Sequence, residues 1–532
     1  MAKKSTFTYK VAAIVALGGL LMGFDASVVS GVNKFVQIDF DLTDPQLGWS
    51  VSSLTLVAAI AMLFAGPISD RYGRRIVLKA CAIIFTISAV GSALAPSYIL
   101  FLLFRMLGGI GVGASLILAP MYIAEIAPPK VRGAMVSFNQ LNIVIGISLA
   151  LVTNYIIVSL GNSDATWVES LGIAEHNWRW MLVLEALPAV FYYFGLLGVP
   201  RSPRWLVMQG RDEEAIQVMT LFRTEEEATS DITEVKTSLE ADANKIKATL
   251  GDLFKPAFSL VLIIGLVVGV LQQITGINAV FFYAPMIFEQ TGGGTDAAFL
   301  QSVIVGIVNL VFTIFAMSVI DKFGRKLLLL IGVSGITLFL FLIGYSFSQA
   351  TYRLDGDKLD AIVMSLNDND GKEPEFVLDA SKLQGVVGQT FSSDVEYKDT
   401  MKELLGPKVA KVYESQLIGA AIELNATLVL IGILGFIASF AISLGPVTWV
   451  LFSELFPLSI KAIAISFVGA INSLVSFGVQ FVFPWELSAI GSAPTFFIFA
   501  ALGLLGLIFI IFKVPETKGK SLEELEAILI KK

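Results

Sequence analysis

Residues 70–75 read Asp-Arg-Tyr-Gly-Arg-Arg and stand between two long apolar runs, and residues 321–326 repeat the pattern as Asp-Lys-Phe-Gly-Arg-Lys between two others. A second pair of motifs follows the same order along the chain. Residues 125–132 have the pattern Glu-x-x-Pro-x-x-x-Arg, and residues 454–461 have the pattern Glu-x-x-Pro-x-x-x-Lys. The chain therefore consists of two related halves.

The composition places these halves in lipid. Of 532 residues, 55% are hydrophobic and only 15% are charged, and the mean hydropathy is +0.77. Soluble domains carry about 25% charged residues. The excess apolar surface needs a lipid bilayer to cover it. The single cysteine, Cys81, excludes an internal disulfide.

The apolar runs predict twelve membrane-spanning helices, because a span needs roughly 20 apolar residues. We expect them over residues 11–31, 47–69, 76–95, 97–123, 134–159, 178–199, 258–288, 298–319, 327–348, 419–453, 462–484 and 494–513. The predicted fold class is an all-α membrane protein with two bundles of six helices. Duplicated halves of this kind are typical of transporters. Within span 4, Gly109-x-x-x-Gly113 predicts close helix packing.

The predicted division of the chain follows from these spans. The parts are an N-terminal bundle (1–199), a charged cytoplasmic helical linker (200–257), a C-terminal bundle (258–513) with an extracytoplasmic insertion (349–418), and a cytoplasmic tail (514–532).

Positively charged residues set the predicted orientation. If the N-terminus lies inside, nearly all lysines and arginines outside the spans fall on the cytoplasmic side. The short outside segments then hold only Lys34 and Arg179. The long segment 349–418 holds further lysines, but long loops translocate largely regardless of charge. We therefore expect a multi-pass protein with both termini in the cytoplasm.

Three ionisable residues are predicted at one depth in the first half. With a rise of 1.5 Å per residue, Asp25, Arg105 and Glu185 each fall about 10 Å below the outer face of a ~30 Å core. Ionisable groups at that depth are costly and usually functional. If Arg105 moves between the two acids, Asp25 can gain and lose a proton in each cycle. The alternative interpretation is a static buried ion pair.

The second half has neutral polar groups at span depth instead. Amide side chains offer the donors and acceptors that hydroxyl-rich ligands require, and a tryptophan face can stack on a sugar ring. Residues 272–278 also form a weakened stretch of helix, and irregular backbone at membrane depth lines cavities. The alternative is ordinary interhelical hydrogen bonding. The groups are Gln272, Gln273, Asn278, Asn309, Trp449 and Asn472.

The basic loops between spans predict a cytoplasmic latch, in which arginines reach helix C-termini and carboxylates of the facing half. The alternative is charge that only sets topology. The residues proposed for the latch are Asp70, Arg74, Arg75, Glu125, Arg132, Asp321, Arg325 and Glu454.

With these residues in place, the chain resembles the sugar porters of the major facilitator superfamily over nearly its whole length. The motifs that carry the resemblance are Gly23-Phe24-Asp25, residues 70–75 and 321–326, residues 120–125 (PMYIAE) through Arg132-Gly133, residues 202–206 (SPRWL), residues 272–278 (QQITGIN), Gly445-Pro446-x-x-Trp449 and residues 515–519 (PETKG).

The resemblance implies a sugar pocket that also includes Gln140, and a proton-coupling network of Asp25, Arg105 and Glu185. An acid at position 25 favours proton symport. The resemblance also implies a monomer in the bacterial inner membrane that carries a monosaccharide and protons, without a cofactor, a metal, nucleic acid or enzymatic activity. The alternatives are a facilitative uniporter and, on another class of function, a non-transporting sugar sensor. A sensor is expected to have a long cytoplasmic signalling tail.

Overall fold

Twelve segments of the structure are long and apolar enough to cross a membrane, which confirms the predicted number. This computed structural model describes residues 2–128, 131–243, 249–367, 378–457, 459–520, 524–525 and 529. Within these residues the candidate spans are Thr6–Asp39, Asp44–Tyr72, Arg74–Ala93, Tyr98–Ile126, Met135–Gly161, Asn177–Leu197, Pro256–Phe282, Gly294–Ile320, Arg325–Ser348, Ala426–Leu455, Lys461–Ala489 and Ser492–Lys513.

Helices make up almost the whole described chain. In the first half they are α1 (Ala2–Asp39), α2 (Asp44–Tyr72), α3 (Arg74–Ala93), α4 (Tyr98–Ile126), α5 (Arg132–Gly161), α6 (Thr166–Ser170), α7 (Asn177–Val183) and α8 (Ala186–Leu197). The linker holds α9 (Pro203–Met208), α10 (Asp212–Met219), α11 (Glu225–Ala243), η1 (Leu250–Phe254) and η2 (Pro256–Phe258). The second half holds α12 (Ser259–Ile274), α13 (Ile277–Phe282), α14 (Ala284–Glu289), α15 (Gly294–Phe323), α16 (Arg325–Ser348), α21 (Ala426–Ile442), α22 (Leu444–Leu455), α23 (Lys461–Ala489) and α24 (Ser492–Lys513).

Three spans are interrupted. The break in the seventh lies in the weakened stretch 272–278 that we predicted, whereas those in the sixth and tenth were not predicted. The sixth is divided into α7 and α8, the seventh into α12 and α13, and the tenth into α21 and α22. The tenth also begins at Ala426 rather than near residue 419. The reason is that Ile418 and Ala421, which look like the start of an apolar span, are fully buried in the core of the insertion.

The chain folds into two compact units. Unit 1 contains Met1–Val29, Ser53–Thr153 and Arg179–Thr249, and unit 2 contains Ser30–Ser52, Asn154–Trp178 and Leu250–Lys532. One end of each of α1, α2 and α5 therefore belongs to unit 2. The division into bundles predicted from the sequence stays a prediction.

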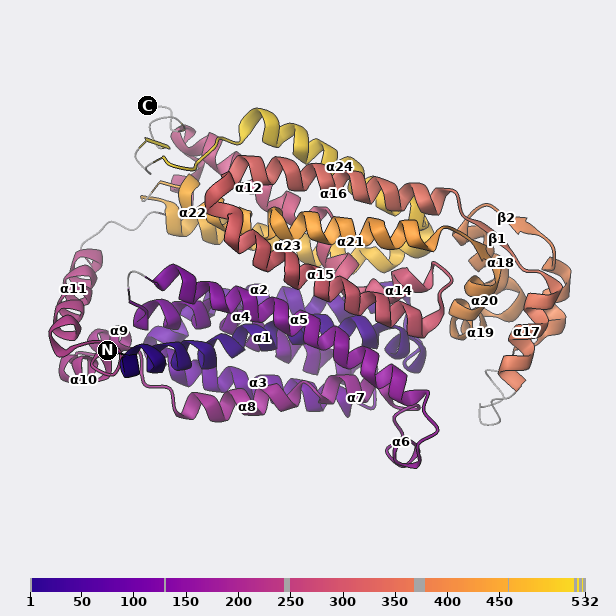
Figure 1. The fold of residues 1–532 in the computed structure, drawn as a ribbon, viewed down its shortest axis with the longest axis horizontal. Helices are drawn as coiled ribbons and strands as arrows, with labels where there is room; N and C mark the ends of the chain where they lie inside the picture. The colour runs from indigo at the N-terminus through magenta and orange to yellow at the C-terminus, as the bar shows by residue number, and fades with distance from the viewer. Residues whose placement is uncertain are drawn as a thin grey trace. The chain divides into compact units, whose positions relative to one another are not determined.

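In unit 1, α3 packs against both α4 and α8. The linker helices α9, α10 and α11 gather near the start of α1 (Figure 1), where the rings of Phe7 and Phe222 lie 5.5 Å apart. Both rings belong to one apolar cluster that joins the linker to the spans. The amphipathic linker thus buries its apolar face against the ends of the spans.

Glycines allow α2 and α4 to approach each other closely. A Cβ atom on Gly109 would meet the backbone oxygen of Leu54, and one on Gly113 would meet the backbone oxygen of Ala58. The close packing predicted from Gly109-x-x-x-Gly113 is therefore confirmed. No comparable neighbour faces Gly66 of α2, where nothing lies within 4 Å of an added Cβ.

In unit 2, α16 packs against α21 and α24, and α12 packs against α23. The segment 30–52 from the first half packs among these helices. Gly48 faces the backbone oxygen of Phe481, and the ring of Trp49 makes edge contacts with Phe477 at 5.7 Å and Phe481 at 6.2 Å.

The insertion is a small domain with its own core at the ends of α16 and α21 (Figure 1). Its central strand β1 (Thr351–Arg353) pairs antiparallel with β2 (Thr390–Phe391) and β3 (Ile422–Glu423), so that Tyr352 lies opposite Phe391 and Ile422. Stacked rings of Tyr352 and Tyr397 fill its centre. Its helices are α17 (Gly356–Asn367), η4 (Ala380–Val386), α18 (Asp394–Leu405), α19 (Pro407–Val412) and α20 (Glu414–Ala421).

The packing of α2 on α4 gives a direct test. We expect Gly113→Ala to destabilise the protein by about 1–3 kcal/mol, because the added methyl group forces two backbones apart. Gly66→Ala is the matched control, and we expect it to be neutral or stabilising by up to about 1 kcal/mol because alanine favours helix. Thermal unfolding in detergent measures both. Equal midpoints for the two variants would contradict the close approach.

Candidate functional site

A buried ion pair joins α1 to α4 in unit 1. Arg105 Nη1 pairs with Asp25 Oδ1, and Arg105 Nη2 donates to the backbone oxygen of Asp25 at 3.2 Å. Both side chains are buried, with exposures of 0% for Asp25 and 1% for Arg105. Bringing charges out of water costs several kcal/mol per ion, so pairing is required for this arrangement to fold.

Glu185 completes the charged group at the break between α7 and α8. Its charge is close enough to interact with those of Asp25 and Arg105. The side chain is 1% exposed, and neither carboxylate oxygen has a hydrogen-bond partner among the described residues. Glu185 is the N-cap residue of α8, so it lies at the break between α7 and α8 and not inside either helix. The structure thus brings together all three residues that the sequence placed at one depth.

Gly108 makes room for this group. An added Cβ there would lie 2.8 Å from Asp25 Oδ2 and 2.6 Å from the hydroxyl of Ser88. Asp25 Oδ2 has no hydrogen-bond partner in the described chain. The sequence analysis missed Gly108, since a glycine in an apolar helix carries no sign of which side chain lies against it.

The charges of the cluster do not balance by themselves. Two carboxyl groups face one guanidinium, so the cluster has a net negative charge if both acids are ionised. One bound proton makes it neutral, and a buried site of low dielectric favours that neutral state. The cluster therefore has an excess of one carboxyl group over its single cation.

Amide side chains form a connected network in unit 2. Asn472 Nδ2 donates to Gln272 Oε1 and to the backbone oxygen of Gly269, both at 2.8 Å. Gln272 Nε2 in turn donates to the backbone oxygen of Leu444 at 2.8 Å, and Gln273 Nε2 contacts Asn472 Oδ1 at 3.4 Å. The structure thus joins α12 to α23 through three of the predicted amides.

The network continues through Asn278. Its Nδ2 donates to Gln273 Oε1 at 2.9 Å and to the hydroxyl of Ser476 at 2.8 Å, and Gln480 Nε2 donates to the same hydroxyl at 2.8 Å. Ser476 and Gln480 were missed by the sequence analysis. Both stand on α23 at one and two turns beyond Asn472, which is the spacing that could have revealed them.

A break in the helix positions this network, as the weakened stretch 272–278 predicts. Helix α12 ends at Ile274, and Gly276 adopts φ 84°, a left-handed conformation that glycine tolerates. The chain then restarts as α13. Because of this turn, Gln273 and Asn278 come within hydrogen-bond distance although five positions separate them.

Three other predicted pocket residues lie outside this network. Asn309 is buried in α15, and Gln140 is exposed on α5 of unit 1. Trp449 is 47% exposed on α22, where its ring contacts Phe452 at 5.7 Å and faces Gly469. An indole with this much free surface remains available for stacking on a ligand.

The first basic loop forms a cluster inside unit 1. Arg74 pairs with Asp70 at 2.7 Å and with Glu125 at 3.2 Å, and Glu125 also accepts a hydrogen bond from the hydroxyl of Ser202. Arg75 donates instead to the last carbonyl groups of α8, those of residues 196 and 197.

The second basic loop repeats this cluster inside unit 2. Arg325 binds Glu454 through two nitrogens, at 3.1 and 2.8 Å, and the hydroxyl of Thr517 donates to Glu454 at 2.6 Å. Thr517 therefore occupies the role that Ser202 has in the first half. The sequence analysis quoted both motifs but assigned neither hydroxyl a partner.

Among the described residues, one predicted latch residue makes no contact that places it in these clusters, and another cannot be assigned to them. Arg132 is exposed at the start of α5. The side chain of Asp321 lies outside the described residues. Glu516, which the prediction did not include, accepts hydrogen bonds from the backbone amides of residues 325 and 326 at 3.0 and 3.1 Å. Burial acts to raise the pKa of Glu516, but these and two further amides outweigh it and hold the pKa below its ordinary value.

Comparison with known proteins agrees with this architecture. The family described as "Sugar (and other) transporter" matches residues 11–364 and 404–529. The chain is 32% identical to the arabinose-proton symporter of Bacillus subtilis over 529 residues, covering 99% of this chain and 96% of the relative. It is also 32% identical to the D-xylose-proton symporter of Escherichia coli over 556 residues, covering 98% and 96%.

A solved structure gives the same result for the fold. The inward-open conformation of the xylose transporter XylE from E. coli superposes with a TM-score of 0.72 at 30% identity, covering 98% of this chain and 100% of that one. Together with the twelve spans, these matches show that the chain is a multi-pass membrane transporter and not an enzyme, and that it belongs to the sugar porter family of the major facilitator superfamily.

Proposed function

We propose that this transporter takes up a monosaccharide, a hexose or a pentose, together with a proton by alternating access. The observation that carries the proposal is the buried cluster of two carboxyl groups and one guanidinium, which needs one proton to become neutral. Two relatives named as proton symporters support it. We place the chain in the bacterial inner membrane as a monomer, with both termini in the cytoplasm and the insertion outside.

Proton coupling follows from competition for Arg105. Its guanidinium pairs with Asp25 in this structure, and this pairing favours the ionised carboxylate. The carboxylate oxygens of Glu185 have no hydrogen-bond partner in the described residues, and this carboxyl group is the alternative counter-ion. When Arg105 shifts toward Glu185, Asp25 loses its counter-ion and takes up a proton. The return of Arg105 releases that proton.

Sugar binding is assigned to the amide network. Amides that bind one another through 2.8–2.9 Å hydrogen bonds have fixed orientations, and each retains donor or acceptor capacity for a ligand hydroxyl. The exposed face of Trp449 adds a surface for a sugar ring. We include Gln140 and Asn309 in the pocket as proposals from the family resemblance.

Alternating access requires an outer end that opens and closes. In unit 2, Lys34 pairs with Glu289 at 2.7 Å and Asn33 Nδ2 donates to the backbone oxygen of Phe282 at 2.8 Å. These contacts join the outer end of α1 to α13 and α14. Opening this end has to break them. The loop clusters around Arg74 and Arg325 are proposed to act at the cytoplasmic end.

Removing the proton site separates coupling from binding. We expect gradient-driven sugar accumulation to fall at least about tenfold in Asp25→Asn, because the amide cannot exchange a proton. Sugar counterflow should be retained. The measurement is uptake of labelled xylose and glucose into membrane vesicles with an imposed pH gradient. Asp164→Asn, at an exposed loop residue, is the matched control and should behave as wild type.

Since Asp25→Asn also leaves the buried Arg105 without a counter-ion, a second variant is needed. Glu185→Gln removes the alternative partner without disturbing the ion pair, and we expect the same separation of accumulation from counterflow. Wild-type accumulation that is unchanged after collapse of the proton gradient would show a facilitator and refute symport.

The amide network gives a test of the binding assignment. Gln273→Ala should weaken sugar binding by about 2- to 160-fold, because it removes one or two hydrogen bonds worth about 0.5–1.5 kcal/mol each. Asn142→Ala is the matched control, since Asn142 donates to the carbonyl of residue 138 in its own helix. If the two variants bound sugar with equal affinity in equilibrium binding, the assignment of the sugar site to this network would be wrong.

A further inference from the structure

A large cavity in unit 2 is lined by none of the residues assigned to the carboxylate cluster or the amide network. Its volume is about 480 Å³, within the range of roughly 300–1,000 Å³ that is typical of small-molecule sites. Residues 41–45, which end the α1–α2 turn and begin α2, line one part of it, and helices α18, α19 and α20 of the insertion line another. The function derived above does not use this cavity.

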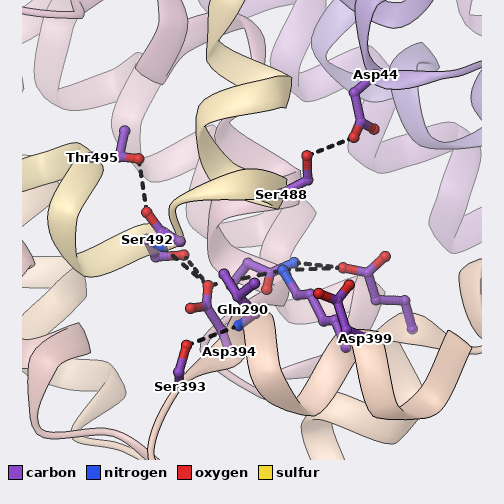
Figure 2. Close-up of polar contacts among 12 residues, drawn as sticks. Asp44, Gln290, Ser393, Asp394, Asp399, Ser488, Ser492 and Thr495 are labelled. Carbon is purple, nitrogen blue, oxygen red and sulfur yellow. Dashed lines mark hydrogen bonds and ion pairs between the residues drawn. The ribbon is translucent and has the colours of Figure 1, made fainter. Parts of the chain in front are cut away.

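Specific contacts hold the insertion against the outer ends of the spans. Lys411 Nζ donates to the backbone oxygen of Leu42, and Lys408 pairs with Asp41 at 3.4 Å. On the other side, Asp394 accepts hydrogen bonds from the backbone amide and the hydroxyl of Ser492 at 3.1 and 3.0 Å (Figure 2). The walls of the cavity are therefore fixed by side chains from both sides.

Further contacts shape the interior. Gln290 Nε2 donates to Glu414 Oε1 at 3.2 Å, and Lys398 lies 3.4 Å from the same carboxylate oxygen. Burial acts to raise the pKa of Glu414, but Lys398 and Gln290 outweigh it and hold the pKa below its ordinary value. Asp44 Oδ2 accepts a hydrogen bond from Ser488 at 2.6 Å, as Figure 2 shows.

The lining selects a class of ligand. It contains Lys398, Lys402 and Lys411 against Asp41, Asp44 and Glu414, so it has no net formal charge. A site for a phosphate or a divalent cation has an excess of one sign. Donors and acceptors of both kinds, mixed with apolar side chains, suit a neutral molecule that has many hydroxyl groups.

One polar atom of the lining has an unused hydrogen-bonding capacity. Gln290 Oε1 is buried and has no hydrogen-bond partner among the described residues, although Gln290 Nε2 is bound to Glu414. A buried amide oxygen without a partner costs about 1–3 kcal/mol. A hydroxyl group in the cavity supplies the missing donor.

We propose that this cavity is a second, outer binding site for a neutral monosaccharide. The proposal rests on the proposed function for the class of ligand. A sugar bound here contacts the insertion and residues 41–47 at once, and it therefore holds the outer end of α1 and α2 against the insertion. Because residues 365–403 fall outside the family match, the wall that α18 contributes is a feature of this chain beyond the shared family pattern.

The test is the number of sugars bound per chain. Equilibrium binding of labelled xylose and of labelled glucose to the purified full-length protein should saturate at two molecules per chain in wild type. Gln290→Leu should reduce this number to one, because the cavity loses both the acceptor and the bond to Glu414. Gln389→Leu, an amide in the insertion that donates to the carbonyl of residue 385 away from the cavity, should keep two.

A second variant tests the outer site independently, in case Gln290→Leu does not fold. Met286→Trp fills the cavity from α14 and removes no hydrogen bond of the lining, and it should also leave one site. Conversely, Gln273→Ala should weaken the inner site and leave the outer one, so that failure of the proposed function is distinguished from failure of this proposal. Saturation of wild type at one sugar, or two sites in Gln290→Leu and Met286→Trp, overturns the outer site. Displacement of the outer sugar by inorganic phosphate or Mg²⁺ also overturns it.

Discussion

A single buried guanidinium, paired with one carboxyl group and near a second, is the constraint on which the first unit depends. Arg105 lies in a helix whose other faces contact apolar residues, and its charge is tolerable there only because Asp25 pairs with it. The pairing fixes α1 against α4. Gly108 allows that approach, and the break before α8 brings Glu185 to the same place. The packing of this unit and the proposed proton coupling therefore depend on the same three side chains.

The sequence predicted this cluster because helical rise converts position into depth, and charge inside an apolar run is conspicuous. It could not predict that Glu185 occupies a helix break, since the residues of span 6 give no strong breaker at that point. In the amide network, too, one feature was predictable from the sequence and another was not. The turn at Gly276 was visible as Thr-Gly in an apolar run, but Ser476 and Gln480 became partners only through the packing of α12 and α13 on α23.

The two basic loops show what a repeat does and does not reveal. Arg74 with Glu125, and Arg325 with Glu454, could be paired from duplicated motifs. Their third members, Ser202 and Thr517, follow the last helix of each half in segments with different sequences. The hydroxyl groups nevertheless bind equivalent carboxylates. Because the two donors have the same chemistry but stand in different sequences, a search for identical motifs cannot find them.

The insertion was the part least predictable from sequence, because its core is made of residues that have no transmembrane periodicity. Ile418 and Ala421 looked like the beginning of a span and instead pack with Tyr352 and Tyr397. Once folded, this domain presents lysines to residues 41 and 42, next to the segment that carries Lys34. In the proposed cycle, opening of the outer end separates Lys408 from Asp41 and Lys411 from the carbonyl of Leu42, as well as Lys34 from Glu289. Under this proposal, an insertion that has its own core sets how readily the transporter opens, without contributing any residue to the cluster of Asp25, Arg105 and Glu185.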